Sequence, residues 1–515
     1  MVLLRAAMEK HIKGTALDIH NNPAWKGKEG IHTKDPILED IITGELSRYQ
    51  DIEGYYAAVD IGTTTLSIAI YDHYGKYVGG CAERNAQGKL GSDVMMRLMH
   101  VSEGRQEILH ALIRDQIYHD LSNLLTDVVD AEYTAADTDI INDEHIGDDA
   151  DAVMAHLHKI AVVGNTVMCH LFLNKDTAGL RGTPFCTAYQ GSCRIRGRDL
   201  GWFACPDVEI TVLPGIAAHV GADAAAVLMA ENLWQGDRVQ LAVDLGTNAE
   251  ILLNNRGNIW VCSAAAGPAF EGQGISCGCR GGAGAVSGVK LNRANGNILL
   301  DVVPDPLAGR LLPRGICGSG LVDLIAELLE NNLLQPDGYL LSQTEAKERG
   351  ISAVFAQRLE EEGGERRFLL YDPLADKMAD ADRKQTKCLF VTQQDIRNFQ
   401  LAKSGIQTGI ALLCQQNNLD VTQIEDCRVA GVFGAFLHPD HAKASGLLPD
   451  LPSDRIHFVG NAAGRGAAQA LFDPEWIPDL EKRIREVHHL ELAEQDDFQT
   501  IFLQNMALGK WKMNQ

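Results

Sequence analysis

Apolar and polar positions follow the same pattern in two distant stretches of the chain, residues 57–72 and 241–253. The stretches read "AAVDIGTTTLSIAIYD" and "LAVDLGTNAEILL". In each, an apolar run of strand length leads into an aspartate, a turn beginning with Gly-Thr follows, and a second apolar run begins. This is the pattern of a β-hairpin. We therefore predict two strand–Asp–Gly–Thr–strand hairpins in one chain.

The segments around the hairpins alternate between helical and strand-like patterns. Residues 92–129 carry apolar positions at helical spacing, which predicts one or two helices. Buried strands followed by a glycine turn and a helix are predicted in 158–173 and in 212–234, and similar strand–helix pairs continue to residue 472. Two hairpin-headed halves of this kind predict an α/β protein with a duplicated core.

This pattern divides the chain into four parts. Residues 1–54 lack a sustained period and are predicted to form an arm or a small helical appendage. Residues 55–213 and 214–480 are predicted to form two lobes, and 481–515 a C-terminal extension that packs on the core. Residues 130–151 contain nine acidic residues and no Lys or Arg. They are predicted to form a solvated insertion, with a docking surface for a basic partner as the alternative.

Composition narrows the class of protein. A chain of 515 residues is too long for one hydrophobic core. Its net charge of −23 disfavours binding to nucleic acid or to anionic membranes. The sequence contains no apolar run of membrane-spanning length, and its first residues are too charged for a signal peptide, so we expect a cytoplasmic protein. Its 12 cysteines include no C-x-x-C pair, which argues against a closed zinc site or a ferredoxin-type cluster.

The hairpin turns have the chemistry of a phosphate site. A tight turn of Gly and Thr exposes backbone N–H groups, and the threonine hydroxyls add further donors. An aspartate at the mouth of each turn can hold Mg²⁺ through water and orient an attacking water or hydroxyl. One such turn alone is as well explained as an ordinary β-turn, but a pair suits a nucleoside triphosphate held from both sides. The predicted catalytic and Mg²⁺-holding residues are Asp60 and Asp244, and the predicted phosphate-binding residues are Gly62, Thr63, Thr64, Thr65, Gly246, Thr247 and Asn248.

Three glycine-rich segments are candidates for the nucleoside pocket. Each follows a strand or opens a helix with small residues, where a base or ribose can approach the backbone. The alternative for each segment alone is a close-packed strand-to-helix turn. The predicted residues are Gly318, Ser319, Gly320, Gly431, Gly434, Gly460 and Asn461.

The hairpins and the strand "AGVFGAF" resemble the actin, heat-shock chaperone and sugar kinase superfamily, whose fold is a duplicated ribonuclease H-like core with two lobes around a nucleotide cleft. Further segments resemble one branch, the reductive activators of corrinoid proteins: "VGNTVMCHLFL", "PGIAAHVGADAAA", "AAAGPAFEGQGISCGCRGGAGAV", "GICGSGLVDLIAELL", "VTQQDIRNFQLAKSGIQTGIALL" and "GLLPDLPSDRIHFVGNAAGRGAA". The resemblance covers residues 55–472 in order. It implies an ATP- and Mg²⁺-dependent enzyme that returns an inactive Co(II) corrinoid protein of a methyltransferase system to Co(I), and it assigns the phosphate and nucleoside roles to the residues named above.

The chain departs from this family's pattern in one respect. The resemblance implies an iron–sulfur domain ahead of the ATPase region, but here that region has only about 54 residues and no cysteine before Cys81. We therefore expect no iron–sulfur cluster in this chain and a separate ferredoxin-like electron donor. A homodimer is left open. A small-molecule kinase and a non-redox remodelling ATPase are the alternative functions on the same fold.

A few further residues have competing interpretations. Cys277 and Cys279 are either cluster ligands or small buried side chains, and burial is favoured. Cys317 is interpreted as structural. His438 and His441 resemble metal ligands, but an ordinary loop is favoured. Glu271, in "GPAFEGQG", is the polar residue that we expect at an interface or in catalysis.

Overall fold

The computed structural model describes residues 54–136, 150–189, 191–304, 312–373, 387–431 and 437–511. The arm predicted for 1–54 lies outside these ranges except for its last residue, and so does most of the insertion predicted for 130–151. Gly434 also lies outside them.

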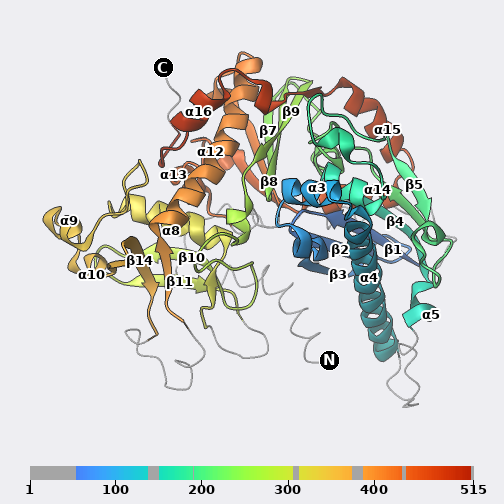
Figure 1. Cartoon of the computed structure of the whole chain (residues 1–515), viewed down its shortest axis with the longest axis horizontal. Coiled ribbons are helices and arrows are strands. Elements are labelled where there is room, and N and C mark those ends of the chain that lie inside the picture. The colour runs from blue at the N-terminus through green and yellow to red at the C-terminus, as the bar shows by residue number, and fades with distance from the viewer. Residues whose placement is uncertain are drawn as a thin grey trace.

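Two six-stranded sheets form the body of the protein (Figure 1). The first has the order β3-β2-β1-β4-β6-β5, and the second has the order β17-β16-β7-β8-β9-β18. The strands of the first are β1 (Tyr55–Ile61), β2 (Thr65–Tyr71), β3 (Tyr77–Arg84), β4 (Leu157–Gly164), β5 (Cys193–Arg196) and β6 (Glu209–Val212). Those of the second are β7 (Val239–Leu245), β8 (Asn248–Asn255), β9 (Asn258–Ala265), β16 (Asp426–Ala430), β17 (Ile456–Gly460) and β18 (His488–His489).

The two sheets repeat one topology. Each begins with three antiparallel strands joined by hairpins, β1-β2-β3 in the first and β7-β8-β9 in the second. The first strand of each then pairs in parallel with a later strand, β4 or β16, and a further parallel strand, β6 or β17, follows. This is the duplicated ribonuclease H-like core, so the predicted α/β fold class is confirmed.

Helices cover the first sheet because their apolar residues recur on one face. In α4 (Gln106–Ala136) the residues Leu109, Ile113, Ile117, Leu121 and Leu125 recur every four positions and are completely buried. The predicted helical region is therefore two helices, α3 and α4. The other helices before β7 are η4 (Ala86–Leu90), α3 (Val94–Ser102), α5 (Ala150–Met154), α6 (Thr166–Phe172), η6 (Ala178–Leu180), η7 (Gly197–Leu200) and α7 (Ala222–Ala230).

Helices α7 and α14 (Ala462–Phe472) connect the two halves of the chain through their packing. They pack against each other, and α14 also packs on β1 and β4 of the first sheet, although it comes late in the sequence. Phe472, Trp476 and Leu480 belong to the hydrophobic core of the first sheet. The segment around α14 and α15 (Trp476–Arg483) thus packs with the first sheet, although the predicted limits place it in the second lobe. The lobe limits of 55–213 and 214–480 stay a prediction.

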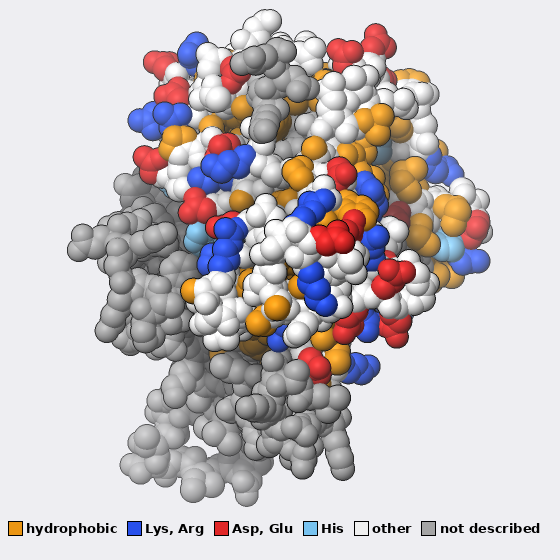
Figure 2. All heavy atoms as spheres, turned by 90° about the vertical axis from the view of Figure 1, so that its left-hand side faces the viewer, with side chains coloured by type: hydrophobic (Ala, Val, Ile, Leu, Met, Phe, Trp, Pro, Cys, Tyr) orange, Lys and Arg blue, Asp and Glu red, His pale blue; other side chains and the backbone are white. Residues whose placement is uncertain are grey.

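Two three-stranded sheets extend the second half (Figure 1). Their strands are β10 (Ala285–Leu291), β11 (Ile298–Val302), β12 (Gly315–Ile316), β13 (Leu359–Glu362), β14 (Glu365–Tyr371) and β15 (Leu389–Thr392). The accompanying helices are η8 (Pro268–Glu271), α8 (Gly318–Glu330), α9 (Gln343–Glu348), α10 (Ala353–Ala356), α12 (Gln393–Gln416), η9 (Val421–Gln423), α13 (Pro439–Ala444) and η11 (Ser453–Arg455). On the face of the molecule shown in Figure 2, basic and acidic side chains are interspersed.

The C-terminal segment returns to the second half. Strand β18 pairs with β9, and helix α16 (Phe498–Gln504) packs along α12. Gln400 of α12 donates a hydrogen bond to the Met506 carbonyl over 2.7 Å. The short helices η12 (Ile484–Glu486) and η13 (Leu492–Glu494) flank β18. Within the described ranges, none of the helices is long and apolar enough to cross a bilayer.

Candidate functional site

The two predicted hairpin turns meet at the junction of the two sheets. The hydroxyl oxygens of Thr64, between β1 and β2, and Thr247, between β7 and β8, are 2.8 Å apart. Arg280 adds a second contact between the halves, because its guanidinium donates a hydrogen bond of 2.6 Å to the Thr65 hydroxyl. The structure thus brings together two turns that lie 183 residues apart in the sequence.

The carbonyl groups of the first turn accept hydrogen bonds from two residues that follow in the sequence, Asn85 and Arg97. The Gly62 carbonyl accepts from the Asn85 amide and the Thr64 carbonyl from the Asn85 backbone N–H, each over 2.8 Å. The Thr63 carbonyl accepts from Arg97. Within the described part of the chain, the N–H groups of Thr63 and Thr64 have no acceptor. Successive N–H groups left open in a turn form a site for an anion such as phosphate.

Both predicted catalytic aspartates lie in a cluster of carboxyl groups. Burial, together with the Asp223 carboxylate, raises the pKa of Asp60 to about 7, although a hydrogen bond from Asn461 opposes this. Burial and the carboxylates of Asp60 and Asp223 raise the pKa of Asp244 to about 8. Burial and like charges at close range both disfavour ionisation, so these carboxyl groups keep their protons to a higher pH than usual.

Two members of this cluster were missed by sequence reasoning. Asp223 lies in the first turn of α7, and burial raises its pKa to about 6. Glu250 is the register partner of Asp244 across β7 and β8, and burial raises its pKa well above the usual range. A signal for Glu250 was available, because a carboxylate within the apolar strand "NAEILL" has to be neutralised or paired.

Glu271 lies where the turns meet. Its Oε1 accepts a hydrogen bond from the Thr247 hydroxyl over 3.2 Å, and its Oε2 is buried and has no hydrogen-bond partner in the described residues. Burial raises its pKa, while hydrogen bonds from Thr64 and Thr247 act in the opposite direction. The predicted role of Glu271 at an interface or in catalysis stays a prediction.

These side chains suit Mg²⁺ held through water. They offer only oxygen donors, and the orphaned Oε2 of Glu271 has an unused acceptor position. Among the residues that the structure describes, no group of three or more His, Cys, Asp and Glu side chains is arranged to hold a metal directly. Mg²⁺ commonly keeps several waters and contacts only one or two carboxylates, so this arrangement fits it.

Some of the residues predicted to bind the nucleoside lie beside the aspartates of the two turns. The Gly431 N–H donates to the Gly460 carbonyl over 2.9 Å, and Asn461 caps α14 by accepting from the Gly464 N–H over 2.7 Å. Gly431 has a φ of +96°, and a Cβ there would lie 2.5 Å from the Leu245 carbonyl oxygen and 3.1 Å from Asp244 Oδ1. The ends of β16 and β17 are thereby fixed beside Asp244.

The segment Gly318–Ser319–Gly320 is used for packing. Ser319 is 2% exposed, and its hydroxyl donates to the Ser287 carbonyl over 2.8 Å. A Cβ on Gly320 would lie 2.2 Å from the Val286 carbonyl oxygen, so α8 begins in close contact with β10. This geometry matches the alternative of a close-packed turn, and a nucleoside role for these residues stays a prediction.

The cysteines and histidines singled out above lie elsewhere in the second half. Cys277 and Cys279 are half-buried free thiols, and burial together with Cys317 raises the pKa of Cys279 to about 12. His441 lies in helix α13, so the favoured interpretation of an ordinary loop was wrong for this residue. Its Nδ1 is 2.7 Å from Asp323 Oδ1, which fixes it to α8.

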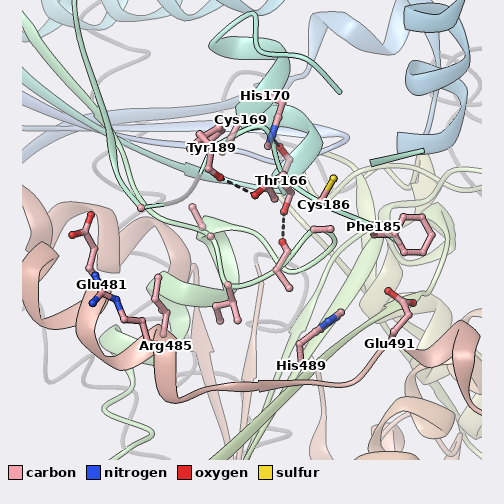
Figure 3. Close-up of a pocket in the computed structure, with 18 of the residues that line it drawn as sticks. Thr166, Cys169, His170, Phe185, Cys186, Tyr189, Glu481, Arg485, His489 and Glu491 are labelled. Carbon is pink, nitrogen blue, oxygen red and sulfur yellow. Dashed lines mark hydrogen bonds between the residues drawn. The ribbon is translucent and has the colours of Figure 1, made fainter. Parts of the chain in front are cut away.

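A cavity of about 800 Å³ lies between the loop after α6 and the segment around α15 and β18 (Figure 3). In Figure 3 Glu481 and Arg485 lie on one side, and His489 and Glu491 on another. None of the residues predicted from the sequence as catalytic or nucleotide-binding lines this cavity. The predicted site and the large cavity are therefore distinct.

A repeated ribonuclease H-like core with an Asp-x-Gly-Thr turn from each half at the junction defines the ASKHA class of folds, which includes actin, heat-shock chaperones and sugar kinases. The sequence matches the model of the RACo middle region over residues 55–142 and 140–236. It matches the model of the C-terminal ASKHA domain of RACo over residues 238–515. The chain therefore belongs to the family of reductive activators of corrinoid proteins, and the resemblance seen in its motifs is confirmed.

Named relatives agree with this assignment. The chain is 30% identical over 460 residues to the corrinoid activation enzyme RamQ of Eubacterium limosum, with 88% of this chain and 70% of that protein covered. It is 24% identical over 391 residues to a [Co(II) methylated amine-specific corrinoid protein] reductase of Methanosarcina barkeri, with 68% and 63% covered.

A solved structure agrees as well. The reductive activator for corrinoid, iron–sulfur protein has a TM-score of 0.72 and 26% identity, with 89% of this chain and 66% of that chain covered. The chain thus spans slightly less than two thirds of the length of that solved relative.

Proposed function

We propose that this chain hydrolyses ATP between its two lobes and that hydrolysis supports the reduction of a corrinoid protein from Co(II) to Co(I). The names of the two curated relatives support a corrinoid protein as the partner. One electron passes to cobalt from a separate reduced iron–sulfur protein, and ATP and water give ADP and phosphate. The electron donor and the methyltransferase system are part of the proposal.

The contact between the two Asp-Gly-Thr turns carries this proposal. The N–H groups of Thr63 and Thr64 and the hydroxyl of Thr65, which accepts from Arg280 and keeps its own proton, are donors suited to the phosphate oxygens. Asp60 and Asp244 would hold Mg²⁺ through water and orient the attacking water. Bound Mg²⁺ would supply positive charge against the phosphates and the carboxyl cluster.

The nucleoside would lie against the ends of β16 and β17. A Cβ on Gly460 would meet no atom of the described residues within 4 Å, so these residues leave open space beside this backbone. Gly431 and Asn461 would border the same space, and Asn461 also donates to Asp60. An adenosine placed there would contact the second sheet and lie close to Asp60 of the first turn.

Contacts between the lobes give hydrolysis a route to the partner. Thr64–Thr247 and Arg280–Thr65 join the halves next to the proposed phosphate position, so nucleotide state would change how the lobes close. Moving one electron uphill by 100 mV costs about 2.3 kcal/mol. A coupling of about 1–3 kcal/mol between nucleotide and partner binding is of the same order.

Phosphate release by wild type and by Asp244→Ala tests the site. We expect the variant to lose ATP turnover by about 100-fold or more. Asp237→Ala, which removes an exposed carboxylate ahead of β7, should keep wild-type turnover. Retained turnover in Asp244→Ala would refute the assigned site, and a phosphorylated small molecule in place of free phosphate would favour the kinase alternative.

A further inference from the structure

Helix α3 buries a charge and exposes apolar side chains, which is the reverse of a typical surface helix. Arg97 is 0% exposed, whereas Met95, Met96 and Met99 are 63%, 41% and 50% exposed. No carboxylate in the described ranges forms an ion pair with Arg97. Burying a guanidinium without such a partner costs free energy, and its hydrogen bonds have to offset that cost.

The Arg97 guanidinium is fixed by acceptors from three segments: η4 with the residue after it, the first turn, and α6, where Met168 Sδ accepts from Nη1 over 2.7 Å. Its Nε donates to the Gly91 carbonyl and its Nη1 to Gln87 Oε1, each over 3.1 Å. Its Nη2 donates to the Thr63 carbonyl of the first turn. Gln87 is itself held, because its Nε2 donates to the Leu109 carbonyl over 2.9 Å. The planar fork of an arginine can satisfy several acceptors in one rigid geometry, which a lysine cannot do.

The hydrogen bond from Arg97 to the Thr63 carbonyl affects how strongly the neighbouring N–H group of the turn can donate. The Thr63 carbonyl and the Thr64 N–H belong to one peptide unit, so a cationic donor on the carbonyl polarises the N–H and strengthens it as a donor. Asn85 holds the carbonyls on either side, those of Gly62 and Thr64. The three successive carbonyls are therefore occupied, and the N–H groups of Thr63 and Thr64 are left for a ligand.

We propose that Arg97 is the positioning residue of the first phosphate turn: it fixes the Thr63 peptide and supplies a permanent positive charge behind it, so that the turn receives the phosphates of a nucleotide. The inference rests on the proposed function. Arg97 acts through the turn and does not touch the nucleotide. Burial lowers the pKa of Arg97 to about 10, opposed by the carboxylates of Asp93 and Glu271, so the side chain stays charged at neutral pH.

Calorimetric titration with ATP·Mg and with adenosine separates this role from a purely structural one. For Arg97→Met we expect the Kd for ATP·Mg to rise about tenfold or more, while the Kd for adenosine stays within about twofold. Arg97→Lys should lose less, because an ammonium keeps the charge and one hydrogen bond. The control Arg105→Met makes the same change at an arginine whose side chain is 45% exposed, and it should bind both ligands like wild type.

Each outcome decides the inference. Unchanged ATP·Mg binding by Arg97→Met, or an equal loss for adenosine, would overturn it. If Arg97→Met does not fold, Gln87→Leu takes its place, since it removes an acceptor that orients the guanidinium and should give the same selective loss at smaller size. Failure of wild type to bind ATP·Mg would instead refute the proposed function, so the two failures are distinguishable.

Discussion

Replacing Asp244 by asparagine should stabilise the nucleotide-free protein while removing its ATP turnover. Burial and the carboxylates of Asp60 and Asp223 raise the pKa of Asp244 from 3.8 to about 8. The folded protein therefore retains a proton on Asp244 that the unfolded chain releases, and stability falls as pH rises through this window. Asparagine has the same shape and carries no charge, so it escapes this penalty.

The structure sets the size of the effect. A pKa raised by one unit corresponds to about 1.4 kcal/mol, which bounds the full effect at about 6 kcal/mol. Asp244 is only half-buried, and Asp60 and Asp223 relieve part of the same repulsion by binding protons themselves. We therefore expect about 1–3 kcal/mol above pH 8, or about 1–3 °C in Tm for a chain of this length.

Thermal unfolding at about pH 5 and about pH 9 measures the effect. Asp244→Asn should gain little over wild type at the lower pH and about 1–3 °C at the higher one. Asp237→Asn makes the same charge change at an exposed position and should shift Tm equally at both pH values. Added ADP and Mg²⁺ should raise the Tm of wild type more than that of Asp244→Asn. A gain that does not grow with pH, or a loss of stability at high pH, would refute the reasoning.

Three further changes test other parts of the structure. Gly431→Ala should cost about 1–3 kcal/mol in denaturant unfolding, and more than Gly460→Ala, because Gly431 has a φ of +96° and no space for a Cβ. Burial lowers the pKa of Lys403 to about 7, so the contribution of Lys403 to stability should rise between about pH 7 and pH 10. Lys403→Met should remove that rise; an unchanged slope would contradict it. Arg280→Ala should raise the KM for ATP by about three- to tenfold in a phosphate-release assay, because its guanidinium holds the Thr65 hydroxyl beside the proposed phosphate position; an unchanged KM would contradict this role.

The sequence predicted those features that depend on short, local patterns. Each hairpin is specified within about 15 residues by alternation, a Gly-Thr turn and an aspartate. The duplication of these hairpins then indicated that both turns serve one site, and the contact between Thr64 and Thr247 agrees with that interpretation.

The remaining features depend on contacts between distant segments. Asp223 belongs to the carboxyl cluster only because α7 packs against β4, β7 and β8, and Arg97 reaches Thr63 from a helix 34 residues later. Helix α14 packs on the first sheet although it follows β17 of the second sheet in the sequence, and the periodicity of its apolar residues does not specify which sheet it covers. Gly318 and Gly320 show the converse, since the same glycine pattern serves close packing of α8 on β10 as well as an open ligand site.

The most direct test of the central claim combines phosphate release with the cobalt spectrum in one cuvette. The sample contains this protein, ATP, Mg²⁺, a Co(II) corrinoid protein and a low-potential iron–sulfur donor. The account predicts that the corrinoid protein stimulates phosphate release and that Co(I) forms only when ATP is present. ATP hydrolysis with cobalt remaining as Co(II) would contradict it and favour a remodelling or kinase function.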